Sequence, residues 1–204
     1  MARPREFDEA TVLDAAIQCF WDKGFEATSM RDLTERMRMT AASLYNAFGD
    51  KKALFRRALD HYVDCNFAER ARRLGGSGPP RQIIAAYFDE VIERSLDDPL
   101  RKGCMVINSA MDVAPHDPEM QAAVVEILGR IEDFFRRTIE AGQAEGSIAR
   151  RYPAADLARM LLGVLTGLRV LTRARPEREL LEGMVRPVFS LLAPPSTEER
   201  PKHG

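Results

Sequence analysis

The sequence predicts an all-α fold, and three observations lead to that prediction. Apolar side chains recur every three or four residues in nearly every segment of the 204-residue chain, which is the period of an amphipathic helix. Residues that cap helix starts, among them Ser29, Thr40 and Asp50, stand directly before such segments. No segment shows the strict apolar-polar alternation of a half-buried strand, and no internal repeat is visible.

The composition is that of an ordinary globular protein. Hydrophobic residues make up 45% and charged residues 30% of the chain, which supplies enough apolar surface for a substantial core. The net charge of −1 excludes a general polyanion binder, so any contact with nucleic acid must depend on local charge. The apolar stretches are shorter than the roughly 20 residues of a membrane span, and no secretory signal is recognisable at the N-terminus. Three cysteines without a CxxC pair indicate reduced thiols, and we expect a cytoplasmic protein.

The first two predicted helices are set by an apolar face and by their end signals. Residues 8–23 place Val, Leu, Ala, Ile, Phe and Trp side chains on one face, and Gly24 follows as a stop. The second helix starts at Thr28 or Ser29, where an acid three residues after the serine makes a capping box. It is short and ends near Arg38.

The third and fourth helices complete a helix-turn-helix unit. Thr40 caps the short segment "AASLYNAF", and a Gly-Asp break separates it from the next helix, which Asp50 caps. Two short helices joined by a tight turn and flanked by longer helices form this motif. After the break "GGSGPP" at residues 75–80, further helices are predicted at residues 81–96, 103–113, 120–142, 154–173 and 177–192.

The stretch around the third helix concentrates positive charge. Residues 36–57 contain six basic side chains and one acid. A helix start with free N–H groups, a threonine hydroxyl, a tyrosine hydroxyl and nearby lysines suits contact with phosphate. Ala41 and Ala42 keep the start of this helix slim enough for a DNA major groove. DNA binding is therefore one interpretation, and a solvated connector between buried helices is the other.

The segment "TSMRDLTERMRMTAASLYNAFGDKKALF" resembles the DNA-binding signature of TetR-type transcriptional regulators, and "FWDKGFEATS" before it fits the same pattern. The resemblance covers roughly residues 8 to 60. It implies a helix-turn-helix domain of three helices at residues 1–52 and a larger helical ligand-binding and dimerisation domain at 53–192. Residues 193–204 lack enough apolar surface to fold, so we expect a loose tail there. Such regulators are usually homodimeric repressors that a small molecule releases from palindromic double-stranded operator DNA.

The resemblance also assigns DNA contacts to individual positions. Leu44 and Phe48 match positions that pack the recognition helix. The matching phosphate-facing, groove-facing and backbone-contacting positions are Thr28, Ser29, Thr40, Ala41, Ala42, Tyr45, Asn46 and Lys51. Arg38 departs from the glycine that is usual in the turn. An arginine there is unfavourable if φ is positive, but it adds a candidate phosphate contact.

The helices of the larger domain predict an effector pocket and a dimer interface. The candidate pocket residues are mostly apolar with two polar anchors, and they are Tyr87, Phe88, Met105, Met111, Phe134 and Leu168 with Asn108 and Arg130. The same residues would also build a plain core. The segment at 154–173 is apolar almost all round, which predicts contact with a partner chain through Met160, Gly163, Val164, Gly167 and Leu171.

The sequence gives less support for a reactive thiol, a metal site or a catalytic site. Cys104, which follows Arg101 and Lys102 near a predicted helix start, is either a reactive thiol that senses oxidants or a small buried side chain. His116 lies in a Pro-flanked turn without metal-ligand spacing, so we expect neither a metal nor a cofactor. No catalytic set of residues can be assembled, and an enzyme is not expected. A helical sensor or interaction protein that has lost DNA binding, possibly thiol-based, remains the alternative function.

Overall fold

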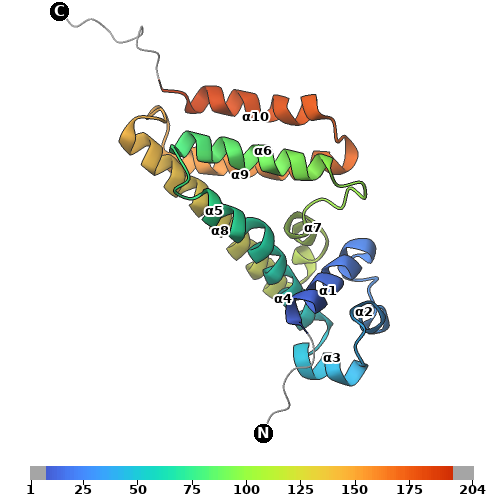
Figure 1. Ribbon diagram of the computed structural model, residues 1–204. Coiled ribbons are helices and arrows are strands. Elements are labelled where there is room, and N and C mark those ends of the chain that lie inside the picture. Colours follow the sequence, from blue (N-terminus) through green and yellow to red (C-terminus); the bar gives the residue numbers. More distant parts are fainter. Residues whose placement is uncertain (1–7, 195–204) are drawn as a thin grey trace, which may run out of the picture. The chain divides into compact units, whose positions relative to one another are not determined.

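The computed structural model describes residues 8–194, and every regular element within them is helical. The all-α prediction is therefore confirmed for this part of the chain (Figure 1). The helices are α1 (Glu9–Lys23), α2 (Met30–Met37), α3 (Ala41–Phe48), α4 (Lys51–Val63), α5 (Glu69–Leu74), α6 (Pro80–Leu96), α7 (Met105–Asp112), α8 (Pro118–Glu145), α9 (Ala154–Ala174) and α10 (Arg178–Leu192). Most of the predicted tail lies outside the described residues.

Contacts among the helices divide the described chain into two compact units. Unit 1 contains residues 8–69 and 104–125, and unit 2 contains residues 70–103 and 126–194. Helices α4 and α7 thus belong to the same unit as the three N-terminal helices, and α7 packs against α4. The predicted boundary between the DNA-binding and the ligand-binding domain, after residue 52, divides the chain into two continuous segments. As a boundary between functional domains it stays a prediction.

Unit 1 is built on α1, which packs against α2 and α4. The ring of Phe20 on α1 lies edge-on to Phe55 of α4, with 4.8 Å between the centroids, and Phe25 joins the same cluster at 4.9 Å from Phe55. Leu44 and Phe48 are buried, as their predicted packing roles require. These two side chains fix one face of α3 to the unit and leave its opposite face to solvent.

The fourth predicted helix does not continue as a regular α-helix. Helix α4 ends at Val63, a π-helical segment η1 follows at Asp64–Ala68, and the chain resumes as α5. A π-helical turn holds one more residue than an α-helical turn, and such turns occur often at functional sites. The amphipathic pattern alone did not predict this irregularity, because the apolar spacing continues through it.

Unit 2 places α6 against α9 and α10, and these three helices run side by side (Figure 1). Four aromatic rings from α6 and α8 form part of its core. The rings of Phe88 and Phe135 are stacked with centroids 5.8 Å apart, and Tyr87 lies edge-on to Phe135 at 5.1 Å. Such rings remove large apolar areas from water when they are buried, so they contribute strongly to the stability of this core.

Helix α8 extends past its predicted end near Gly142 and reaches Glu145. The reason is a packing contact, since a Cβ atom at Gly142 would lie only 2.6 Å from the Cδ1 atom of Ile148. The glycine therefore makes room for the returning chain and does not terminate the helix. The chain turns at Gly146, whose φ of 86° is the left-handed value that stops many helices.

Candidate nucleic-acid interface

Helix α3 presents a slim polar face to solvent. Thr40 caps the helix, and its hydroxyl oxygen accepts a hydrogen bond from the backbone N–H of Ser43 at 3.1 Å. Ala41, Ala42 and Asn46 are exposed, and the side chain of Tyr45 is 51% exposed. The outer face of α3 thus consists of small and hydrogen-bonding groups that nothing in unit 1 covers.

The start of α2 differs from the prediction at one of its two residues. Ser29 is exposed, and it forms a capping box with Asp32, whose carboxylate accepts a hydrogen bond from the Ser29 backbone N–H at 2.9 Å. A hydrogen bond from Lys23 holds the pKa of Asp32 well below its ordinary value. Thr28 is only 1% exposed, and its hydroxyl donates to the carbonyl oxygen of Gly24 at 2.6 Å. The Thr28 side chain therefore closes the α1–α2 connection in this structure.

The turn between α2 and α3 contains the arginine that replaces the usual glycine. Arg38 has φ 53° and ψ 42°, so it occupies the left-handed region as the C-cap of α2. Its backbone N–H bonds back to the carbonyl oxygens of Glu35 and Thr34. The turn geometry is thus kept although the residue has a Cβ atom, and the guanidinium projects from an exposed position beside α3.

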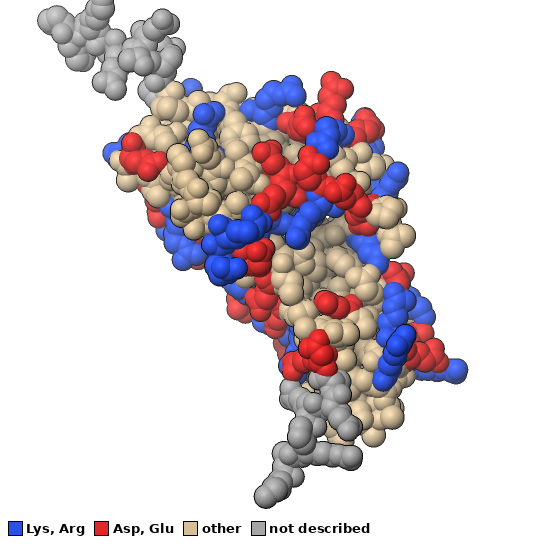
Figure 2. All heavy atoms as spheres, viewed as in Figure 1, with Lys and Arg blue, Asp and Glu red and all other residues tan. Residues whose placement is uncertain are grey.

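Most of the basic side chains near α3 have partners inside the protein. Arg36 pairs with an acid on α1, Lys52 with two acids near the start of α8, and Arg56 and Arg57 each with an aspartate or glutamate. The Lys51 ammonium donates to the carbonyl oxygen of Phe25 at 2.9 Å. Within residues 8–194, Arg38 is the basic residue of this stretch whose side chain has no partner. On the face drawn in Figure 2, Lys and Arg side chains lie among Asp and Glu side chains, so no broad basic field covers it.

This arrangement can recognise base pairs in a DNA major groove while making few contacts with phosphate groups. The exposed face of α3 carries donors and acceptors of the kind that read base edges, with Asn46 as the side chain best suited to adenine. A lysine ammonium has three donors, so Lys51 can keep its carbonyl bonds and still reach a phosphate. Arg38 adds an unpaired cation next to the helix start.

The predicted effector residues are divided between the two units. Tyr87, Phe88, Phe134 and Leu168 belong to the core of unit 2 and are buried. Met105, Asn108 and Met111 belong to unit 1, where Met105 is buried and Met111 is 53% exposed. Arg130 is exposed, which suits a surface residue better than a buried polar anchor.

Arg70 is a buried charged residue that the sequence patterns did not single out. It is 2% exposed and begins the part of the chain that belongs to unit 2. A signal for its burial was present, because Phe67, Arg70 and Leu74 follow one another at the i, i+3, i+7 spacing of a single helix face.

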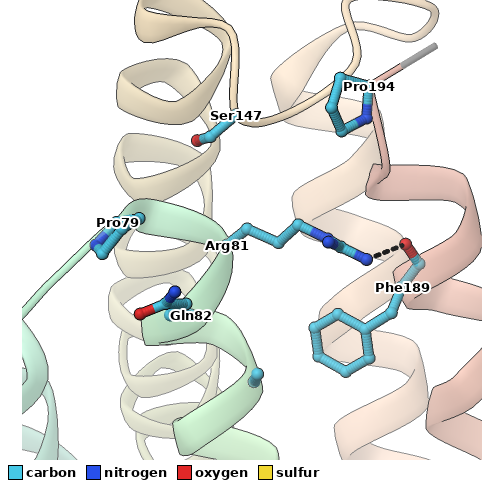
Figure 3. Close-up of a pocket in the computed structure, with 7 residues that line it drawn as sticks. Pro79, Arg81, Gln82, Ser147, Phe189 and Pro194 are labelled. Carbon is cyan, nitrogen blue, oxygen red and sulfur yellow. Dashed lines mark hydrogen bonds between the residues drawn. The ribbon is translucent and has the colours of Figure 1, made fainter. Parts of the chain in front are cut away.

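A surface pocket of about 490 Å³ lies in unit 2 and contains none of the predicted effector residues. Its lining comes from the start of α6, the end of α10 and the loop at Ser147 (Figure 3). The Arg81 guanidinium crosses the pocket and donates from Nη2 to the carbonyl oxygen of Phe189 at 3.2 Å (Figure 3). A neighbouring hollow is lined by residues of α8 and of the loop before α9.

Within the described residues, no group of three or more His, Cys, Asp or Glu side chains could hold a metal ion. Cys104 is half-buried and occupies the N-cap of α7, so a helix does start where the sequence predicted one. Cys65 is exposed, and its Sγ atom lies 3.8 Å from Nε2 of His61. Burial raises the pKa of both the Cys65 and the Cys19 thiols, which disfavours their thiolates.

The predicted dimer face of α9 is only partly used inside the chain. Leu157, Leu161 and Leu165 fill the core of unit 2, whereas Met160, Val164 and Leu171 are half-buried. A Cβ atom at Gly163 would meet nothing within 4 Å, so this position is open. Gly167 differs, because a Cβ atom there would lie 3.1 Å from the Cε atom of Met184 on α10.

Comparison with known proteins agrees with this geometry. A family model described as bacterial regulatory proteins of the tetR family matches residues 12–58, and one described as a tetracyclin repressor-like C-terminal domain matches residues 79–187. The chain belongs to the TetR family. It is a DNA-binding transcriptional regulator with an N-terminal helix-turn-helix domain, as the resemblance of residues 8 to 60 implied.

Individual relatives cover most of this TetR-family chain. The uncharacterized HTH-type transcriptional regulator YezE of Bacillus subtilis (strain 168) is 33% identical over 148 residues, which is 72% of this chain and 76% of YezE. The HTH-type transcriptional repressor ComR of Escherichia coli (strain K12) is 29% identical over 181 residues, or 88% and 86% of the two chains. A structure of a cysteine mutant of the TetR-family regulator CifR, complexed with 26-base-pair double-strand operator DNA, matches with 34% identity and a TM-score of 0.81 over 92% of this chain and 98% of that one.

The part of the chain that the structure describes contains no helix with the length and apolarity of a membrane span.

Proposed function

We propose that this regulator is a homodimeric repressor that binds a palindromic operator through α3 and leaves it when a small-molecule effector binds the C-terminal part of the chain. The observation that carries the proposal is the exposed face of α3, where Ala41, Ala42, Tyr45 and Asn46 are left uncovered while Leu44 anchors the helix. A helix with a slim outer face and a fixed inner face has the form that enters a major groove. We place the protein in the cytoplasm, where operator DNA is found, and assign it no catalytic residue.

Within the helix-turn-helix domain, we assign different roles to the exposed residues. Thr40, Ala41, Ala42 and Asn46 would face the base edges, since they lie at the start or on the outer side of α3. Phosphate contacts would come from Ser29, Arg38, Tyr45 and Lys51. Thr28 would act through its hydrogen bond to Gly24, because its buried hydroxyl orients the start of α2.

The dimer would form through α9 and α10 of two copies. Gly163 is open and flanked by the half-buried Met160 and Val164, so a second copy of this helix could approach closely. Leu171 extends the same apolar face by two helical turns. A two-fold interface of this kind would present two copies of α3 to successive major grooves, which fits a palindromic site.

A gel shift against DNA upstream of the protein's own gene tests the proposal. Wild type should give a discrete complex, and a variant with Tyr45→Phe and Lys51→Ala together should bind all DNA more weakly. Equal affinity of the two proteins for the operator would refute the assignment of α3 as the recognition helix. The variant Arg130→Ala serves as the matched control, because it also removes an exposed basic side chain but lies outside unit 1.

Thiol-based control of operator binding is a second candidate for the way this regulator responds to a signal. The observation that favours it is the position of Cys104, a half-buried thiol at the N-cap of α7. The same gel shift, repeated with peroxide, tests this candidate, which predicts that peroxide releases the operator complex.

A further inference from the structure

Arg70 on α5 is a buried cation with an unused hydrogen-bond donor. Its side chain is 2% exposed, and its Nη2 atom is buried without a hydrogen-bond partner among the described residues. Arginine stays protonated at any physiological pH, so this charge cannot be removed by proton loss. Because an unpaired buried donor is unfavourable by the full desolvation penalty of the group, such an atom calls for a physical explanation.

The carboxylate that pairs with Arg70 is shared with a second arginine. Nε of Arg70 donates to Oε2 of Glu90 at 3.1 Å. Arg73 holds the same carboxylate through both of its oxygens, at 2.9 Å and 2.6 Å. These bonds from Arg73, and then that from Arg70, keep the pKa of Glu90 below its ordinary value against the opposing effect of burial. Two guanidinium groups therefore share a single ionised carboxylate.

The surroundings on the other side of Arg70 are aromatic. The Cζ atom of Arg70 lies 5.3 Å from the ring centroid of Tyr87, which is within the range of a cation–π contact. Tyr87 in turn contacts Phe134 and Phe135, with centroids 5.6 Å and 5.1 Å away. A guanidinium with a free donor thus borders a cluster of rings inside unit 2.

From this arrangement we infer that Arg70 is the anion anchor for an effector that carries one carboxylate on an aromatic or other apolar body. This inference rests on the proposed function, whose effector class it specifies. A singly charged carboxylate can accept from the unpartnered Nη2 donor, whereas a doubly charged phosphate would bring a second negative charge into a poorly solvated site beside Glu90. A planar carboxylate also matches the fork of the guanidinium.

The ion pair between Arg70 and Glu90 gives an effector a path in from solvent, and it lets Arg70 exchange Glu90 for the carboxylate of the effector. Glu90 is 31% exposed and Arg73 is 45% exposed, so the outer end of the cluster reaches solvent. Since Arg73 alone can keep Glu90 neutralised, Arg70 can turn toward an incoming carboxylate without leaving Glu90 unpaired. Arg70 lies two residues after the π-helical segment Asp64–Ala68.

Binding measurements on the full-length protein test this inference. Isothermal titration would compare benzoate, phenylacetate, 3-phenylpropionate and 4-phenylbutyrate, each with its primary amide. We expect at least one acid to bind about tenfold or more tightly than its amide, because a hydrogen bond to a charged group is lost in the amide. If no acid is preferred over its amide, the inference is wrong.

Three variants test which arginine causes the preference for an acid over its amide. Arg70→Met should abolish the difference between acid and amide, and Glu90→Gln should increase the affinity for the acid, because it removes the competing carboxylate. Arg81→Met is the matched control, since Arg81 also has a buried unpaired nitrogen but borders the pocket of Figure 3. A preference that survives Arg70→Met, or that disappears with Arg81→Met, would overturn the assignment. If Arg70→Met does not fold, a lack of increase with Glu90→Gln has the same consequence.

The failure of this inference can be distinguished from a failure of the proposed function. Operator binding without any ligand is measured separately by gel shift. If the operator complex forms and no acid is preferred, repression stands and the effector class is wrong. If an acid binds through Arg70 but no operator complex forms, the ligand site stands and the repressor proposal fails.

Discussion

Replacing Arg38 by glycine should change stability and DNA binding in opposite directions. Arg38 has a left-handed backbone with φ 53°, and its side chain is exposed without a partner among the described residues. A residue with a Cβ atom is disfavoured in this conformation by about 1–2 kcal/mol. The greater freedom of a glycine in the unfolded chain offsets about 0.4–1 kcal/mol of that gain. We therefore expect Arg38→Gly to stabilise the protein by roughly 0.5–1 kcal/mol and to raise its Tm by about 1–4 °C.

The effect on DNA binding follows from counterion release. If each Arg38 neutralises one phosphate, a dimer loses two contacts, and the slope of log K against log salt becomes less steep by about 1.8. Between about 50 and about 200 mM salt, wild type should then lose roughly 12-fold more affinity than the variant. Fluorescence anisotropy with a labelled operator measures both slopes directly.

Arg101 provides the matched control for this experiment. It is the other non-glycine residue in the described chain with a positive φ, 49°, and it is also exposed. Arg101→Gly should stabilise the protein to a similar degree and leave the salt slope unchanged. Two results would refute the reasoning about Arg38: a loss of stability in Arg38→Gly, or a salt slope that stays at the wild-type value.

The remaining predictions concern recognition, assembly and the thiols. Asn46→Ala should change the preference for one base position per half-site by about 1–3 kcal/mol, whereas Tyr45→Phe should weaken binding to all operator sequences alike. A binding-site selection experiment checks this, and a wild-type ranking of sequences in both variants would contradict it. Gly163→Leu should leave the fold intact, because the position is open within the chain, and should split or distort the dimer; sedimentation that shows an unchanged dimer would exclude Gly163 from the interface. Cys104→Ser should keep operator affinity and lose release by peroxide, while Cys19→Ser should keep both; a gel shift with peroxide checks this, and release that persists in Cys104→Ser would count against a sensor role for that thiol.

The sequence predicted local features well because short-range physics determines them. Caps at Ser29, Thr40 and Asp50 depend on a side chain and a backbone N–H only a few residues apart, and all three are present. The burial of Leu44 and Phe48 likewise follows from helical spacing within one short segment. The exposed face of α3 could therefore be predicted before any tertiary contact was known.

Features that depend on one specific packing or hydrogen-bond contact were not predictable from the same patterns. Gly142 was expected to end a helix, but the side chain of Ile148 requires the missing Cβ instead. Gly167 is predicted to face a partner chain, and the structure adds that its missing Cβ leaves room for Met184 of the same chain. Thr28 matches a position at the surface of DNA-binding domains, but its hydroxyl closes the α1–α2 connection. In each case a specific packing or hydrogen-bond contact, which the pattern of residue types does not encode, decides the role of the residue.

The basic residues near α3 illustrate why the number of basic residues in a segment does not predict the number of phosphate contacts. The stretch at residues 36–57 contains six basic residues, yet most of them hold acids or carbonyl oxygens of the protein itself. Exposed ion pairs of this kind are weak, so they orient side chains more than they stabilise the fold. They also keep positive charge in fixed positions without creating a broad basic field, which limits binding to unspecific DNA. A net charge of −1 is therefore compatible with operator binding. Specificity can come from the uncovered face of α3, while a few cations, above all Arg38 and Lys51, fix the register of that helix on the duplex.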